Sequence, residues 1–240
     1  PAELTDQLQK ELTAEFKKTK KPVWNKSFIK DALLLMSHSK CCYSECYINA
    51  GSSFMEVEHF FPKSIYPNEV LEWTNLLPAS KKCNGKKGNH DTKKFPIIHP
   101  VKDDPKEHLY LKGYWLKGKT ELGKSTIAVV DLNNRQHFAN SRIEIGERIK
   151  DSLQLLLKLL NQYKNTISTD KKKQDTILGH LKKLMQEAIP KAAYSATTAT
   201  VMLNEKSYTE TKFILQGKKL WSEELQDLEN QMEYCRLDVR

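Results

Sequence analysis

Residues 55 to 88 contain the stretch that decides the fold. Met55–Ser64 reads MEVEHFFPKS, Trp73–Leu77 reads WTNLL, and Cys83–Gly88 reads CNGKKG. The first segment is strand-like and holds an acid–histidine pair. An asparagine follows sixteen residues after the histidine, and a Cys-Asn-x-x-Lys-Gly segment begins the last part. Gly, Pro and Asn break residues 41–95 into short pieces, which predicts a compact loop-and-hairpin unit.

The order and spacing of these residues resemble those of the HNH endonucleases, a family of ββα-metal nucleases. The resemblance implies that His59 is the catalytic base and that Glu58 and Asn84 bind the catalytic metal. Asn75 matches the family's middle asparagine, which holds a loop and orients the base, although an ordinary Asx turn would also favour Asn. His90 is the alternative metal ligand if Asn84 lies too far away.

The chemistry of phosphodiester hydrolysis explains these residue types. An attacking water must lose a proton, and a neutral imidazole such as that of His59 can take it near neutral pH. Glu58 and Asn84 offer the hard oxygen ligands that Mg²⁺ or Mn²⁺ accepts. Because side chains alternate along a strand, Glu58 and His59 face opposite sides unless the strand bends or ends there. The segment Phe60–Pro62 favours such a bend.

Positive charge is concentrated in two runs of lysine. The chain carries a formal net charge of +9; one run lies between Glu15 and Lys30, the other between Ser80 and Phe95. Each run could follow the phosphate backbone of DNA, although a solvated basic face would have the same composition. The second run encloses the predicted site. The predicted phosphate contacts are Lys81, Lys82, Lys86 and Lys87.

The cysteines gather near the same site. Four of the five lie within residues 41–83, which indicates a local site in a reducing compartment rather than a disulfide scaffold. Many HNH endonucleases bind one structural Zn²⁺ through two Cys-x-x-Cys pairs. The resemblance places Ser44 and Ser80, which are poor zinc ligands, at one position of each pair. The remaining candidates for an irregular zinc site are Cys41, Cys42, Cys46 and Cys83. The alternative is a knuckle that folds without metal.

Apolar periodicity divides the chain into four segments. Residues 1–40 are a basic segment with helices over 3–19 and 27–37, and residues 41–95 are the nuclease-like module. Residues 96–132 are a strand and hairpin extension, with strands over 108–115 and 126–132. Residues 133–240 are helical, with helices expected over 135–163, 176–189 and 221–234 and with 192–203 open between helix and loop. The predicted fold class is α+β and mainly helical, in which N-terminal helices and a C-terminal helical region flank the ββα-metal module that the HNH resemblance implies.

Gly118–Ser125 matches the phosphate-loop pattern G-x-x-x-x-G-K-S letter for letter. A phosphate loop needs a buried strand before it and a helix after it. The following segment, Thr126–Val130, is rich in β-branched residues and predicts a strand. A hairpin turn is therefore the preferred interpretation, and we expect no nucleotide site.

Beyond the module, the sequence resembles the PtuB-like HNH subunits of Septu and of related retron-associated defence systems. The similarity extends from about Cys41 to Arg142, and more loosely to the end of the chain, and it includes Phe95–Pro100 (FPIIHP) and Leu132–Arg135 (LNNR). It implies an anti-phage nuclease that acts in a hetero-oligomer with a PtuA-like ATPase. The helical segment 133–240 would then provide a docking surface for that partner.

Several classes of protein are excluded, and two alternatives stay open. No segment approaches the ~20 apolar residues that cross a bilayer, and the charged stretch 1–21 shows no secretory signal, so we expect a cytoplasmic protein without a membrane partner. The main hypothesis is a metal-dependent endonuclease acting on DNA. The alternatives are a catalytically decayed nucleic-acid-binding or scaffold subunit, and a stand-alone restriction-type endonuclease.

Overall fold

The computed structural model describes residues 1–48, 55–163, 165–167 and 169–240. It divides into two compact units, one formed by residues 1–109 and 116–134 and the other by residues 110–115 and 135–240. The fold is α+β and mainly helical, as the sequence predicts. Part of the predicted module, residues 49–54, lies outside the described residues.

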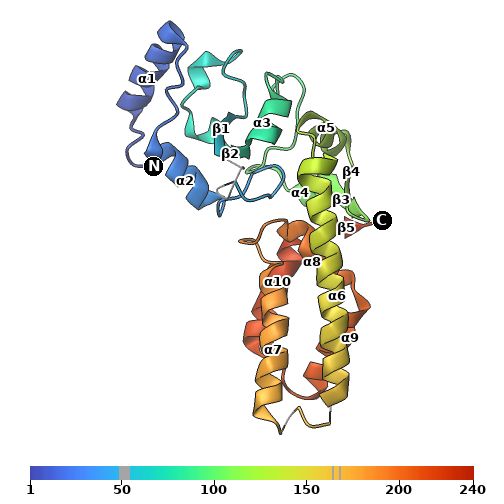
Figure 1. The fold of residues 1–240 in the computed structure, drawn as a ribbon. Coiled ribbons are helices and arrows are strands. Elements are labelled where there is room, and N and C mark those ends of the chain that lie inside the picture. Colours follow the sequence, from blue (N-terminus) through green and yellow to red (C-terminus); the bar gives the residue numbers. More distant parts are fainter. Residues whose placement is uncertain (49–54, 164, 168) are drawn as a thin grey trace. The chain divides into compact units, whose positions relative to one another are not determined.

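Two amphipathic helices begin the first unit (Figure 1). Helix α1 spans Asp6–Thr19, and the hydroxyl of Thr5 caps it by accepting a hydrogen bond from the backbone N–H of Leu8. Helix α2 spans Ser27–Met36 and buries Ile29 and Leu33. Both helices lie where the apolar spacing predicts them; the cap moves the start of α1 to residue 6.

A hairpin and a short helix follow. Strand β1 (Met55–His59) pairs antiparallel with β2 (Leu76–Ser80), with His59 opposite Leu76. The connecting loop contains two 3₁₀ turns, η1 (Pro67–Glu69) and η2 (Trp73–Asn75). Helix α3 (Lys81–Lys87) starts directly after β2, because the Ser80 hydroxyl caps the helix by accepting a hydrogen bond from the backbone N–H of Cys83. Figure 1 shows α3 beside the hairpin, and it contacts both strands.

The two faces of β1 have different environments. Val57 packs in a core shared with α1 and α2, whereas Glu56 and Glu58 point toward α3, where each has a polar partner. One hydrophobic core therefore joins the N-terminal helices to the hairpin across the predicted boundary at residue 40. Its buried members are Leu4, Leu12, Phe16, Val23, Ile29, Leu33, Val57, Val70, Leu71 and Leu76.

The predicted strand over 126–132 is wrong. Strand β4 (Trp115–Gly118) leads instead into helix α5 (Glu121–Val129), which the hydroxyl of Thr120 caps. Thr126 satisfies its hydroxyl within the helix by donating to the carbonyl of Leu122, and it also accepts a hydrogen bond from the N–H of Ile98. These bonds outweigh the preference of β-branched residues for strands. The same unit contains helix α4 (Pro105–His108).

The phosphate-loop-like stretch therefore runs from the last residue of β4 into the first turns of α5, and the predicted hairpin turn is also wrong. Its geometry still does not suit a phosphate. Only two residues separate β4 from α5, and a Cβ added at Gly118 would lie 2.5 Å from the backbone nitrogen of Lys124. A Cβ at Gly123 would lie 2.1 Å from the carbonyl oxygen of His108. Both glycines are explained by close backbone packing.

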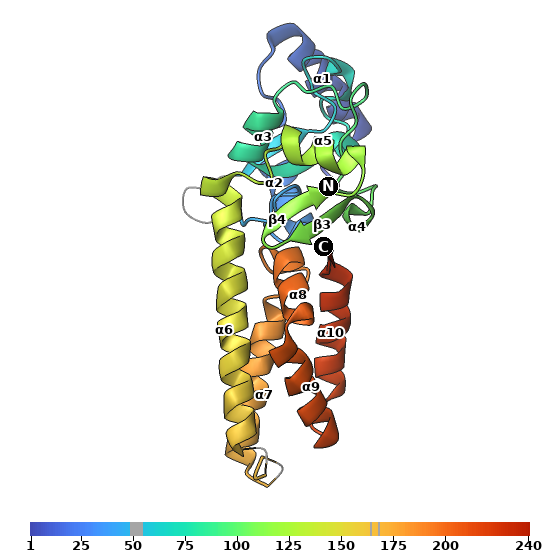
Figure 2. The ribbon, with the colours of Figure 1, turned by 90° about the vertical axis from the view of Figure 1, so that its right-hand side faces the viewer.

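The second unit is a helical assembly. One π-helical turn, η3 (Arg135–Ala139), leads into the long helix α6 (Asn140–Tyr163). Three further helices pack against α6: α7 (Lys171–Gln186), α8 (Ser195–Asn204) and α9 (Lys206–Gly217). The last helix, α10 (Glu223–Cys235), packs against α7 and α8, and Figures 1 and 2 show the assembly from two sides. Strand β3 (Leu109–Lys112), shorter than the predicted 108–115, pairs parallel with β5 (Asp238–Val239).

The apolar stripe of α6 belongs to the core of this unit. Leu153, Leu156 and Leu160 are buried there, whereas Leu155 is exposed. The segment 192–203 forms α8, and α9 is a helix that the sequence analysis did not predict. Within the described part of the chain, no helix combines the length and apolar character needed to cross a membrane.

We expect Gly123→Ala to destabilise the first unit by about 2 kcal/mol or more, because its methyl group would overlap the carbonyl oxygen of His108. Gly179→Ala is the control. It lies within α7 with no heavy atom within 4 Å of the added methyl, and it should be neutral or stabilising by up to about 1 kcal/mol. Thermal unfolding of the two variants tests this, and equal midpoints would contradict the packing explanation.

Candidate functional site

His59 is the most constrained polar side chain of the hairpin. It is only 2% exposed, and the edge of its ring meets the Trp24 ring, with the two centroids 4.7 Å apart. Its Nε2 lies 3.0 Å from the carbonyl oxygen of Val70. Because a carbonyl can only accept, Nε2 carries the proton and Nδ1 has a free lone pair. Nδ1 is buried and has no partner among the described residues.

The surroundings of His59 keep its ring neutral. Burial lowers the pKa of His59 to about 3, with a smaller contribution from the positive charge of Lys63, and the bond to Val70 opposes this only in part. At neutral pH the imidazole is therefore uncharged, and its Nδ1 carries a lone pair rather than a proton.

Asn75 fixes the loop that holds His59. Its Oδ1 accepts from the backbone N–H of Phe61 at 2.6 Å. Its Nδ2 donates to the carbonyl oxygens of Phe61 and Glu69, at 3.2 and 2.9 Å. Glu69 precedes Val70, whose carbonyl binds His59, so Asn75 ties together the two loop segments that flank the histidine. The catalytic role of this arrangement stays a prediction.

On the other face of β1, two acidic side chains meet helix α3. Glu58 pairs with Lys87 at 2.6 Å, and both side chains are almost completely buried. Lys87 also donates to the carbonyl oxygen of His59 at 2.8 Å, and the hydroxyl of Tyr43 donates to Glu58 at 3.3 Å. Burial raises the pKa of Glu58, although the nearby charge of Lys87 opposes this. The amide of Asn84 donates to Glu56 at 2.7 Å.

Lys87 differs from the other predicted phosphate contacts. Its side chain is fully buried, so it cannot serve as a surface contact for DNA in this structure, and its role is to compensate the charge of Glu58. Lys81 and Lys86 are exposed and Lys82 is half-buried. His90, the predicted alternative metal ligand, has its Nε2 2.7 Å from the carbonyl oxygen of Phe95.

The α3 side of the hairpin offers oxygen donors suited to a hard cation. Over residues 1–48, 55–163, 165–167 and 169–240, no group of three His, Cys, Asp or Glu side chains is placed to hold a metal ion. The donors that share this side are two carboxylates, Glu56 and Glu58, and the amide oxygen of Asn84. Mg²⁺ is commonly bound by one or two carboxylates and several waters, and this donor set fits that chemistry.

Sequence reasoning missed Glu56 and the true position of Lys87. Both have a signal in the sequence. Glu56 lies two residues before Glu58 and so shares its strand face. Lys87 lies three residues after Asn84 and so shares its side of the helix. What the sequence does not show is that the lysine turns inward to pair with a carboxylate.

Four of the cysteines, Cys41, Cys42, Cys46 and Cys83, form a cluster of thiols at the start of α3. Burial raises the pKa of Cys41, but hydrogen bonds from neighbouring groups outweigh this and lower it well below its usual value. Those neighbours are Cys42, Cys46, Cys83 and Ser44. Ser44 also donates to the sulfur of Cys46 at 3.2 Å. All five cysteines are free thiols. Zinc binding by this cluster stays a prediction.

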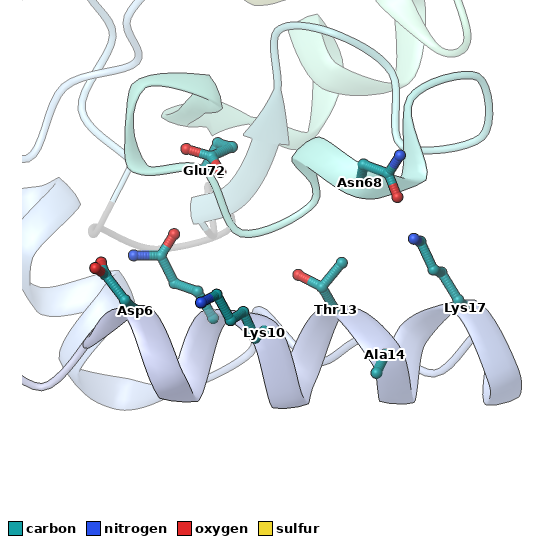
Figure 3. Close-up of a pocket in the computed structure, with 8 residues that line it drawn as sticks. Asp6, Lys10, Thr13, Ala14, Lys17, Asn68 and Glu72 are labelled. Carbon is teal, nitrogen blue, oxygen red and sulfur yellow. The ribbon is translucent and has the colours of Figure 1, made fainter.

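A groove of about 390 Å³ lies away from these side chains, between α1 and the segment from η1 to Glu72 (Figure 3). Lys10, Thr13 and Lys17 line it from the helix, and Asn68 and Glu72 face them. The loop wall is the segment that contains Glu69 and Val70. The groove therefore borders the backbone that positions His59 without containing the predicted ligands.

Comparisons with known proteins identify the family. The chain is 41% identical over 228 residues to the Septu protein PtuB of Bacillus thuringiensis, and the alignment covers 95% of this chain and 88% of the relative. The chain belongs to the PtuB family. A second Septu protein PtuB, from Bacillus mycoides (strain KBAB4), is 27% identical over 191 residues, which cover 62% of this chain and 63% of that relative. The predicted resemblance to PtuB is confirmed. No family model and no solved structure matches.

The buried histidine predicts how the stability of this PtuB-family chain depends on pH. The folded pKa of His59 lies near 3, below the ordinary value of 6.5, so the unfolded chain binds more protons between these limits and stability falls as pH is lowered through them. Each pH unit in this window should cost up to about 1.4 kcal/mol. Hydrogen exchange of peptides from β1 and β2 at pH 7, 5.5 and 4.5 measures the effect.

His59→Gln is the control for this measurement, because it removes the titrating ring and keeps a buried amide. We expect a shallower loss of protection on acidification in this variant. Equal pH dependence in the two proteins would show that His59 is not buried as a neutral ring.

Proposed function

We propose that this PtuB-family protein is a metal-dependent HNH endonuclease that hydrolyses phosphodiester bonds in DNA. The observation that carries the proposal is the state of His59. Its ring is neutral, its Nε2 is fixed by a backbone carbonyl, and its Nδ1 has a lone pair that no described residue uses. A purely structural histidine would gain from a partner at both nitrogens.

Each residue of the hairpin has a distinct task in this proposal. His59 takes the proton of the attacking water at Nδ1, and Asn75 holds the loop that fixes the ring. Glu58 and Asn84, with Glu56 as a further donor, would hold a Mg²⁺ or Mn²⁺ ion. When bound, such an ion supplies positive charge that stabilises the charge of the phosphate during hydrolysis. The exposed Lys81 and Lys86, and the half-buried Lys82, would contact the DNA backbone.

The thiol cluster would have a structural role, as a candidate zinc site, and no part in the hydrolysis. Cys41 interacts with both Cys46 and Cys83, and Ser44 and Ser80 interact with the latter two thiols. Three thiols could bind Zn²⁺ with a fourth donor, but the hydroxyl groups of serine are poor ligands for this metal. The proposed hydrolytic site uses oxygen donors from Glu56, Glu58 and Asn84 rather than these thiols, so its chemistry does not require zinc.

The names of the relatives support a role in a Septu system. We propose that the chain is the nuclease effector of this anti-phage system and forms a hetero-oligomer with a PtuA-like ATPase in the cytoplasm. The helical unit would provide the docking surface. Its exposed apolar side chains include Leu155, Phe213 and Tyr234.

Cleavage of supercoiled plasmid with Mg²⁺ or Mn²⁺ tests the proposal. We expect His59→Ala to lower the rate by about 10²–10⁴-fold, the usual effect of losing a general base. His180→Ala, at an exposed position of α7, is the matched control and should keep full activity. EDTA should abolish cleavage and leave a salt-dependent gel shift. Full activity of His59→Ala would contradict the assignment.

A second candidate is a subunit that binds nucleic acid without cleaving it. The burial of His59 and the existing pairing of Glu58 with Lys87 favour it, because a working site must admit a substrate. This candidate predicts a gel shift in the absence of any metal-dependent cleavage, both for the chain alone and for the complex with the ATPase. Co-purification with an ATPase separates the Septu role from that of a stand-alone endonuclease.

A further inference from the structure

We propose that Lys63 is a further catalytic residue, whose ammonium group contacts a non-bridging oxygen of the phosphate that is cleaved. The inference rests on the proposed nuclease function and adds to it a residue that neither the sequence analysis nor the family comparison assigned.

The backbone fixes Lys63 beside the end of β1. The carbonyl oxygen of Pro62 accepts hydrogen bonds from the N–H groups of Ile65 and Tyr66, at 2.9 and 2.8 Å, so a tight turn begins at Pro62. Lys63 lies in this turn and is half-buried. Its Nζ is 4.8 Å from the centroid of the Trp24 ring, within the range of a cation–π interaction.

The same tryptophan contacts His59. The ring of Trp24 therefore contacts both side chains. The ammonium of Lys63 lies over it, and the centroid of the His59 imidazole is 4.7 Å from its centroid. Electrostatic effects agree with this geometry. The charge of Lys63 helps to lower the pKa of His59, after the larger effect of burial. Burial lowers the pKa of Lys63 itself, while Glu58 and Glu56 oppose this. The ammonium thus lies near both the base and the acidic donors.

Lys63 differs from its neighbours in having no acidic partner. Lys87 is paired with Glu58, and Lys93 is paired with Glu69. No described residue forms a salt bridge or a hydrogen bond with the ammonium of Lys63, as far as the structure extends. Its donors are therefore available to an anion. A preorganised, partly desolvated cation stabilises developing negative charge better than a mobile surface lysine does.

A structural role is the competing explanation, in which Lys63 only covers Trp24. Two variants separate the roles. Lys63→Met keeps the length of the side chain and removes the charge, and Lys63→Arg keeps a charge. Lys173→Met is the control, because it removes an ammonium that lies 4.9 Å from the Tyr163 ring in the helical unit.

The experiment measures plasmid cleavage by the full chain, in complex with its ATPase if the complex is the active form, at steady state with plasmid in excess over enzyme. We expect Lys63→Met to lower kcat by about 10²-fold, the usual loss for one charge-stabilising donor. KM and the gel-shift affinity for DNA should change less than about threefold. The kcat of Lys63→Arg should be at least tenfold higher than that of Lys63→Met. Lys173→Met should cleave plasmid at the rate of the wild type.

The outcomes separate this inference from the function on which it rests. If wild type cleaves and His59→Ala does not, full activity of Lys63→Met overturns the role of Lys63 alone. If Lys63→Met loses DNA affinity and kcat stays unchanged, the lysine is a binding group and the catalytic role is wrong. If wild type shows no metal-dependent cleavage, both proposals are wrong.

Folding of the variants is checked by hydrogen exchange of peptides from β1. If Lys63→Met disturbs β1, Lys63→Gln takes its place. Loss of β1 protection in both neutral variants, with normal protection in Lys63→Arg, would mean that the charge supports packing on Trp24 and would overturn the catalytic role.

Discussion

The hydrogen bonds of the Asn75 side chain are the constraint on which the rest of the hairpin depends. The loop between β1 and β2 is long and mostly irregular, so its backbone groups need partners that the strands do not provide. One buried amide supplies three of them, at Phe61 twice and at Glu69 once. The carbonyl of Val70 is thereby held against His59, and the tautomer of the ring follows from that contact.

Strand β1 separates two kinds of environment. One face carries Val57 and the His59 ring into an apolar core, and the other carries two carboxylates toward α3. The apolar side keeps the imidazole neutral, while the polar side concentrates negative charge that Lys87 partly offsets. A buried ion pair of this kind adds little net stability, because desolvation opposes the attraction. Its value lies in fixing a carboxylate at a defined position on the strand.

The sequence predicted much of this arrangement, for reasons that can be stated. Period-four apolar spacing predicts α1, and the turn-rich composition of residues 41–95 predicts the hairpin region. The predicted strand over 126–132 was wrong, because the hydrogen bonds of Thr126 with Leu122 and Ile98 stabilise a helix despite the β-branched residues. The inward turn of Lys87 could not be predicted either, since a lysine in a basic run has the composition of a surface group. In each failure, a contact with a distant residue, Ile98 with Thr126 and Glu58 with Lys87, acted against the local preference.

The shared core of α1, α2 and β1 has a consequence for how this module can be transplanted or shortened. Composition suggests a cut near residue 40, but Trp24 covers the imidazole and Ile29 and Leu33 cover the inner face of the hairpin. An excised fragment that began at the cysteines would leave those apolar atoms in water. The smallest piece able to fold autonomously therefore includes the N-terminal helices, and any chimera built from the hairpin must bring them along.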